Sequence, residues 1–179
     1  MTTRRDFLQA ASATAGIAFT SCALLDHAHA QGNPGTRKKR QVVVAGKRVK
    51  TVDVHAHCVI PEAMALLNEK TSMQELVVVD DRLRIMDEQG IDYEALSINP
   101  FWYKAERDVA EKLIKTQNEK LTELCSAFPD RLVGMASVSL QFPDLAVQQL
   151  EYAIKKLGMK GVAVGGSVAG ESFSDPKFH

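Results

Sequence analysis

Thr51-Val52-Asp53-Val54-His55-Ala56-His57 has the pattern of one extended strand and is the most informative segment of this chain. Side chains alternate between the two faces of a β-strand, so this stretch predicts one face shared by Asp53, His55 and His57. Two imidazoles two residues apart can bind one metal ion, and a nearby carboxylate can orient them. Burial of two imidazoles without partners costs free energy, so a valine-rich strand favours a metal site over an idle pair. We predict His55 and His57 as ligands of a divalent metal, with zinc as the first choice.

The other three histidines do not complete such a site. His27 and His29 lie in a segment that we expect to be removed, and His179 is the last residue of the sequence. A catalytic zinc ion usually has three protein ligands and one water. The histidine pair is therefore half of a site, and no catalytic residue is assigned.

Residues 1–30 have the pattern of a twin-arginine signal peptide. Arg4-Arg5 precedes a weakly apolar run, and Ala28-His29-Ala30 places small residues where a signal peptidase reads them. We expect cleavage before Gln31, with the twin-arginine export machinery as a partner and the periplasm as the destination. Lipidation at Cys22 is the alternative. The apolar run spans residues 10–25, shorter than the ~20 residues of a membrane span, so no stable membrane anchor is expected.

Residues 31–50 form a basic arm ahead of the predicted domain. Residues 37–50 contain seven Lys or Arg and no acid, whereas residues 51–179 contain thirteen basic and twenty acidic side chains. Such an arm could contact nucleic acid or anionic lipid, but no aromatic residues are interleaved with the charges. We expect a solvated leader and no nucleic-acid partner.

The remainder of the chain predicts alternating helices and strands. Apolar spacing predicts a short helix or ordered loop at 61–70, helices at 80–89, 103–128 and 143–157, and strands at 93–98, 132–138 and 161–164. Gly90 and Gly158 are typical helix stops, and Pro143 suits a first helical turn. Strands separated by helices favour a parallel sheet with right-handed crossovers.

Four βα units in this order fit either a small doubly wound sheet or the first half of a (β/α)8 TIM barrel. Barrel enzymes place their chemistry at the C-terminal ends of the strands, where His57 falls. No glycine-rich phosphate loop follows the first strand, as a nucleotide-binding sheet would require. We therefore expect residues 51–179 to be part of a metal-dependent α/β barrel, since a complete one takes about 250 residues.

The chain resembles the amidohydrolase-related proteins of the aminocarboxymuconate-semialdehyde decarboxylase type. The order and spacing of five stretches carry this resemblance: Val52-Asp53-Val54-His55-Ala56-His57, Met86-Asp87-Glu88-Gln89-Gly90-Ile91-Asp92, Phe128-Pro129-Asp130-Arg131-Leu132-Val133-Gly134, Leu157-Gly158-Met159-Lys160-Gly161-Val162 and Phe173-Ser174-Asp175-Pro176-Lys177-Phe178.

The resemblance implies a zinc-type (β/α)8 metalloenzyme whose first-strand ligands are His55 and His57. It also implies ligands on the fifth, sixth and eighth strands, which these residues do not include. Asp53 matches a position below the histidines, where it would orient the ligands; a structural hydrogen bond to the backbone is the alternative. Asn99 and Trp102, after the second strand, would bind a small-molecule substrate, with ordinary loop packing as the alternative.

Two reactions follow from such a site. A bound divalent metal activates water and polarises substrate oxygens, which allows hydrolysis of a lactone or related bond. Protonation of a carbon beside a carboxylate instead gives non-oxidative decarboxylation of a small or aromatic acid. The alternative of a different class is a catalytically silent half-barrel, either a remnant or one that pairs with another chain as a homodimer, because its open sheet edges would need cover.

Overall fold

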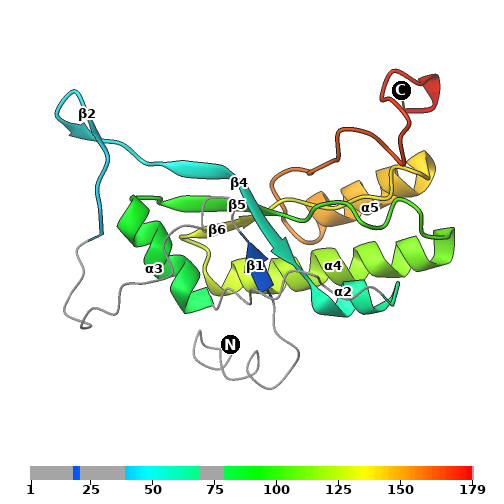
Figure 1. The fold of residues 1–179 in the computed structure, drawn as a ribbon, viewed down its shortest axis with the longest axis horizontal. Helices are drawn as coiled ribbons and strands as arrows, with labels where there is room; N and C mark the ends of the chain where they lie inside the picture. The colour runs from blue at the N-terminus through cyan, green and yellow to red at the C-terminus, as the bar shows by residue number, and fades with distance from the viewer. Residues whose placement is uncertain (1–17, 21–38, 69–78, 179) are drawn as a thin grey trace.

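A parallel sheet forms the centre of the structure, a computed structural model that describes residues 18–20, 39–68 and 79–178 (Figure 1). Its parallel strands are β4 (Val52–Val59), β5 (Tyr93–Ser97) and β6 (Leu132–Gly134). Strand β1 (Ala18–Thr20) pairs antiparallel with β4, so the order is β1-β4-β5-β6. The rest of the predicted signal peptide lies outside the described residues. The predicted strands at 51–57, 93–98 and 132–138 are confirmed, the last in shortened form.

The predicted fourth strand is present only as a single parallel bridge, between Ala136 and Val162. Ala136 donates to the Gly161 carbonyl at 2.8 Å, and Ala163 donates to the Ala136 carbonyl at 2.9 Å. Beyond this point side chains, not a neighbouring strand, satisfy the backbone. The Ser137 N–H donates to Asn118 Oδ1 at 2.9 Å, and the Ser139 N–H donates to Gln149 Oε1 at 2.8 Å. These side-chain hydrogen bonds explain why β6 is shorter than the apolar pattern predicts.

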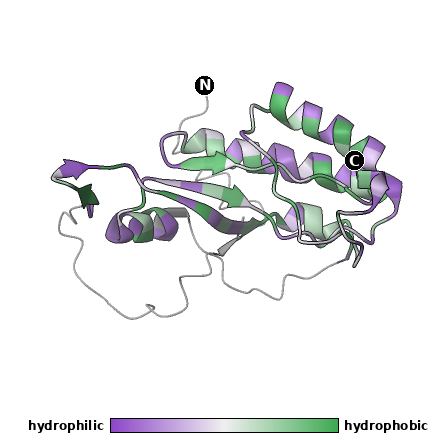
Figure 2. Cartoon of the chain, turned by 90° about the horizontal axis from the view of Figure 1, so that it is seen from above, coloured by the Kyte–Doolittle hydropathy of each residue, from purple (hydrophilic) through white to green (hydrophobic). Residues whose placement is uncertain are grey.

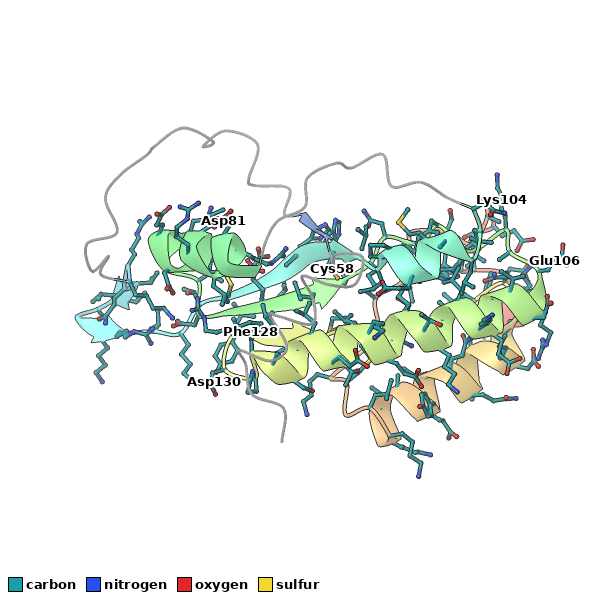
Figure 3. All side chains as sticks on the ribbon, turned by 90° about the horizontal axis from the view of Figure 1, so that it is seen from below. Cys58, Asp81, Lys104, Glu106, Phe128 and Asp130 are labelled. Carbon is teal, nitrogen blue, oxygen red and sulfur yellow. The ribbon has the colours of Figure 1, made fainter. Side chains whose placement is uncertain are left out.

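The described helices follow the predicted order. They are α2 (Pro61–Ala65), α3 (Val79–Gln89), α4 (Arg107–Ala127), α5 (Pro143–Lys155) and the 3₁₀ turn η1 (Pro176–Phe178). Helix α4 begins four residues later than predicted, because Trp102 is buried and Ala105 donates to its carbonyl in a turn. Lys104 and Glu106 mark the start of α4, and Phe128 and Asp130 mark its end (Figure 3).

The core lies between one face of the sheet and the helices. The buried face of α4 repeats at helical spacing, through Ala110, Leu113, Ile114, Gln117, Asn118, Leu121 and Leu124. Strand β5 alternates between partly exposed and buried residues, with Leu96 on the buried side. Figure 2 shows the corresponding division of α4 and α5 into hydrophobic and hydrophilic sides. The opposite face of the sheet is more open: Val54 of β4 is 78% exposed.

The basic arm contacts the domain through ion pairs, although most of its described residues (39–50) are exposed, as expected of a solvated leader. It forms a hairpin of β2 (Val43–Val44) and β3 (Lys47–Arg48). Arg48 pairs with the Asp92 carboxylate, and Lys39 Nζ lies 3.0 Å from Asp92 Oδ1. Gly90, with φ of +81°, leaves room for the arm: a Cβ there would meet the Arg40 carbonyl oxygen at 3.1 Å. Opposite charges therefore hold the arm against the segment around Asp92, which the net charge of the whole chain does not reveal.

Asp92 makes the stability of this attachment dependent on pH. The Thr51 N–H donates to Asp92 Oδ2 at 2.9 Å, and this bond, with Lys39 and Arg48, holds the pKa of the carboxyl well below its usual range. An unfolded Asp titrates near pH 3.9. Below about that pH the unfolded state binds more protons than the folded state, so stability falls as the pH falls toward the folded pKa.

Replacing Asp92 by asparagine is therefore expected to reduce the free energy of unfolding at pH 7 by about 1.5–3 kcal/mol, the contribution of hydrogen bonds to a charged group. Between pH 4 and pH 3 the variant should lose less stability than the wild type, since it has no carboxyl to protonate. Urea unfolding at both pH values measures this. Glu123→Gln, which removes an exposed carboxylate of α4, is the control and should follow the wild type. Equal acid sensitivity of Asp92→Asn and wild type would contradict the assignment.

Candidate metal site

The two histidines of β4 lie with their rings together. The ring centroids of His55 and His57 are 4.5 Å apart, and the ring planes are inclined by 49°. His55 is exposed and His57 is half-buried. Strand β4 runs parallel to β5 with His57 in register with Ser97, the last residue of β5. The pair therefore stands near the C-terminal edge of the parallel sheet, where barrel enzymes carry their functional groups.

A β-bulge interrupts β4 beside the histidines. Asp53 is in register with Glu94 and Ala56 with Leu96, so Val54 and His55 together oppose the single residue between those two partners. Glu94 and Ser97 are three positions apart and face opposite sides of β5. The register thus places Asp53 on the face of Glu94 and His57 on the other face. The prediction that Asp53 shares the face of His57 is wrong, because strict alternation does not cross a bulge.

Asp53 nevertheless contacts the backbone of His55 within the same strand. Its Oδ1 accepts a hydrogen bond from the backbone N–H of His55 at 2.9 Å. This contact bridges the bulge and fixes the backbone from which the His55 ring projects. It fits the structural alternative for Asp53 as well as an orienting role, and the orienting role stays a prediction.

A buried ion pair lies behind His57. Arg82 of α3 is 1% exposed, and its Nε pairs with the carboxylate of Glu94 of β5, which is 3% exposed. Arg82 Nη1 also donates to the backbone carbonyl of His57 at 3.3 Å. The guanidinium thus connects α3, β5 and β4 at the height of the candidate ligand. Burial raises the pKa of Glu94, and the adjacent Arg82 opposes that rise.

The environment of His57 favours the form that can bind a metal. Partial burial, the neighbouring His55 and the Arg82 cation lower the pKa of His57 below its ordinary value, while Asp53 opposes them. The ring is therefore neutral at pH 7, with one nitrogen lone pair available. A metal ligand must be deprotonated, so this direction suits ligation.

The donor set fits two ligands of a metal ion. Two imidazoles with ring centroids 4.5 Å apart can both approach one cation. Within residues 39–68 and 79–178, no group of three or more His, Cys, Asp or Glu side chains is placed to hold a metal. The histidine pair could therefore supply only part of a coordination sphere.

The two predicted substrate residues are placed differently. Asn99 is exposed, and its Nδ2 lies 3.3 Å from Nδ1 of His57, so it stands at the candidate site. Trp102 is 0% exposed and donates from Nε1 to the Val138 carbonyl at 2.9 Å. The prediction that Trp102 binds substrate is wrong for this structure, because the indole packs in the core against Phe101 and Tyr103. This burial favours loop packing, the alternative interpretation of Trp102.

Arg82 and Glu94 are the residues of this site that the sequence pattern did not assign. The sequence does contain a signal for them, since both are charged residues at positions that the apolar pattern assigns to the core. Arg82 stands next to Leu83 and one helical turn before Met86, on the side that packs, and Glu94 shares a strand face with Leu96. Charges at positions that periodicity assigns to a core are rarely fully buried unless paired.

Comparison with known proteins decides the family. A family model described as Amidohydrolase matches residues 52–178, most of the chain and all of the described domain after the arm. The chain belongs to this amidohydrolase family. The fold of this family member is that of a partial (β/α)8 barrel, as the parallel βα order indicates. A putative amidohydrolase from Staphylococcus aureus has the same fold, with a TM-score of 0.63 at 24% identity over 73% of this chain and 42% of that one.

Curated relatives of this amidohydrolase are decarboxylases. Gamma-resorcylate decarboxylase from Rhizobium radiobacter is 37% identical over 93 residues, which are 51% of this chain and 28% of that protein. 2-Amino-3-carboxymuconate-6-semialdehyde decarboxylase from Dictyostelium discoideum is 29% identical over 99 residues, 54% of this chain and 28% of that protein. The matched region thus spans less than a third of these relatives.

Solved structures of decarboxylases are similar as well. A 2,6-dihydroxybenzoate decarboxylase complexed with 2,6-dihydroxybenzoate is 27% identical, with a TM-score of 0.57 over 72% of this chain and 44% of that one. A dihydroxybenzoic acid decarboxylase from a Polaromonas species, solved with manganese and 2-nitroresorcinol, is 26% identical, with a TM-score of 0.57 over 71% and 41% of the two chains.

Proposed function

We propose that this amidohydrolase carries the first-strand ligands of a divalent-metal enzyme that decarboxylates small aromatic acids. The observation that carries the proposal is the pair of imidazoles, with ring centroids 4.5 Å apart, on β4. The 37% identity to a gamma-resorcylate decarboxylase favours decarboxylation over hydrolysis. The matched region covers less than half of the solved relatives.

The described residues have separate tasks in this proposal. His55 and His57 would bind the metal, and Asp53 and Arg82 hold the backbone of these two residues in place. A divalent metal bound there would polarise the oxygens of an aromatic acid. The neutral state of His57 at pH 7 keeps its lone pair available, because burial, His55 and Arg82 lower its pKa.

The identity of the metal, zinc or manganese, can be tested directly. Zinc follows from the histidine pair and the resemblance, whereas a similar decarboxylase structure contains manganese. Imidazole suits zinc, and manganese prefers oxygen ligands. We propose a divalent cation and expect metal analysis of the protein purified without added metal to distinguish the two.

The activity can be tested with matched substrates. We expect manganese- or zinc-loaded protein to release carbon dioxide from 2,6-dihydroxybenzoate, and the His55→Ala/His57→Ala double variant to release none above the buffer rate. Esters and lactones of similar aromatic rings are the comparison substrates. Hydrolysis of these without carbon dioxide release would replace the decarboxylase proposal by the hydrolase alternative. Loss of neither activity in the double variant would remove the histidines from the mechanism.

A folded protein that has no activity on either class but binds metal would favour the silent half-barrel. The open face of β4, with Val54 78% exposed, is the observation that keeps this second candidate. Sedimentation of such a protein as a dimer would support pairing of two copies.

We also propose export through the twin-arginine route, supported by Arg4-Arg5 and the small residues before Gln31. In the described part of the chain, no helix has the length and apolarity to span a membrane. N-terminal sequencing of the mature protein tests this, with a start at Gln31 expected. Protein found only in the cytoplasmic fraction, with Arg4-Arg5 retained, would contradict it.

A further inference from the structure

Asn99 covers one of the two ring nitrogens of His57. Strands β4 and β5 are parallel, and His57 is in register with Ser97, so the chain that leaves β5 passes directly beyond His57. Asn99, two residues after Ser97, places its side-chain Nδ2 3.3 Å from His57 Nδ1. Nδ1 is therefore occupied by a protein group, and Nε2 is the nitrogen left for a metal.

The orientation of the Asn99 amide affects whether Nε2 of His57 has a lone pair free to bind a metal. A neutral imidazole carries one proton, on either Nδ1 or Nε2. If the amide N–H donates to Nδ1, the proton resides on Nε2, and neither nitrogen has a free lone pair. If the amide oxygen accepts a hydrogen from Nδ1, the Nε2 lone pair is free for a cation. Metal-bound histidines usually donate their other N–H to an oxygen in this way.

Rotation of the Asn99 amide exchanges these two arrangements with little cost. A half-turn about the Cβ–Cγ bond puts Oδ1 where Nδ2 stands. Asn99 is exposed, and in the described part of the chain its amide has no hydrogen bond besides the one with His57. The rotation therefore breaks no other hydrogen bond among the described residues.

We propose that Asn99 is the positioning residue of the metal site, and that it directs the metal to Nε2 of His57 by accepting a hydrogen bond from Nδ1–H with its side-chain oxygen. This rests on the proposed metal site and gives Asn99 a role different from substrate binding. His55, by contrast, is held through its backbone N–H by Asp53. The two ligands of one strand are thus oriented by different devices, one at the ring and one at the backbone.

Two variants of Asn99 separate the possibilities. Asn99→Ala removes the hydrogen-bond partner, and Asn99→Asp keeps the size but only accepts. In histidine-labelled protein, ¹⁵N shifts report which ring nitrogen carries the proton, without any metal. We expect Asn99→Asp to place the proton of His57 on Nδ1 and Asn99→Ala to shift it toward Nε2, while the His55 signals stay unchanged as an internal control.

Zinc titration of the same proteins gives the second readout. Residues that orient a metal ligand contribute about 10–100-fold to affinity. We expect Asn99→Ala to weaken Zn²⁺ binding about tenfold, Asn99→Asp to restore it, and Zn²⁺ to shift the Nε2 resonance of His57. Thermal unfolding of each variant verifies that the fold is retained.

The results distinguish a failure of the proposed role of Asn99 from a failure of the proposed metal site. Unchanged tautomer and zinc affinity in Asn99→Ala, or zinc on Nδ1, would overturn the role of Asn99 while His57→Ala still abolished zinc binding. Unchanged zinc binding in His57→Ala would overturn the proposed metal site, and the role of Asn99 with it.

Discussion

Replacing His57 by alanine is expected to abolish divalent-metal binding, with an affinity loss of more than about 100-fold. Even residues that only orient a metal ligand contribute 10–100-fold, so a residue that donates the lone pair contributes more. His57 is half-buried, neutral at pH 7 and held at its carbonyl by Arg82, which makes it the better organised of the two candidate ligands. Calorimetric titration with Zn²⁺ and Mn²⁺ measures the loss, and metal analysis of the purified protein measures its consequence.

The histidine count of the chain supplies a matched control. His179→Ala removes a histidine that neither the strand pattern nor the family resemblance assigns to the site, so it should bind metal like the wild type. His55→Ala should behave as His57→Ala does. An unchanged metal content in the double variant His55→Ala/His57→Ala would refute the ligand assignment for both residues.

Replacing Arg82 by methionine is expected to reduce the free energy of unfolding by about 3–5 kcal/mol, the usual effect of removing one partner of a buried ion pair. The variant leaves the 3%-exposed Glu94 without this cation and removes a donor to the His57 carbonyl. Urea unfolding followed by the fluorescence of Trp102, the chain's single tryptophan, measures the effect.

Helix α3 contains its own control for this change. Arg84 lies two residues along the same helix, but it is exposed and pairs with Asp81 and Glu88 at the surface. Exposed pairs contribute about 0–1 kcal/mol, so Arg84→Met should have a far smaller effect. Similar losses in the two variants would show that the Arg82 ion pair has no special role.

A substitution of the partner of Arg82 separates the effect of charge from that of the hydrogen bonds. Glu94→Gln keeps the shape of the side chain but leaves the buried guanidinium without a counter-charge next to the metal site. We expect weaker metal binding as well as lower stability, since an uncompensated cation repels a metal ion. A folded Glu94→Gln variant that binds metal normally would limit the pair to a structural role.

Local sequence patterns were sufficient for most of the elements. The apolar spacing of α3 and α5 and the alternation of β5 predicted these elements within one or two residues, because their periods reflect the one face that each element buries. The start of α4 was predicted too early, since the pattern cannot show that Trp102 is buried in a turn before the helix. The ion pairs of the arm with Asp92 were not predicted, since net charge does not show which acid faces Lys39 and Arg48.

The order of the βα units and the position of two imidazoles on one strand follow from local sequence, because period and spacing are properties of neighbours along the chain. The surroundings of His57 depend instead on how distant segments pack. The bulge in β4, the Arg82–Glu94 pair and the contact of Asn99 with Nδ1 join residues 12 to 42 positions apart. Such contacts depend on strand register and helix packing, and a single residue of register moves a side chain to the other face. Local periodicity does not specify that register.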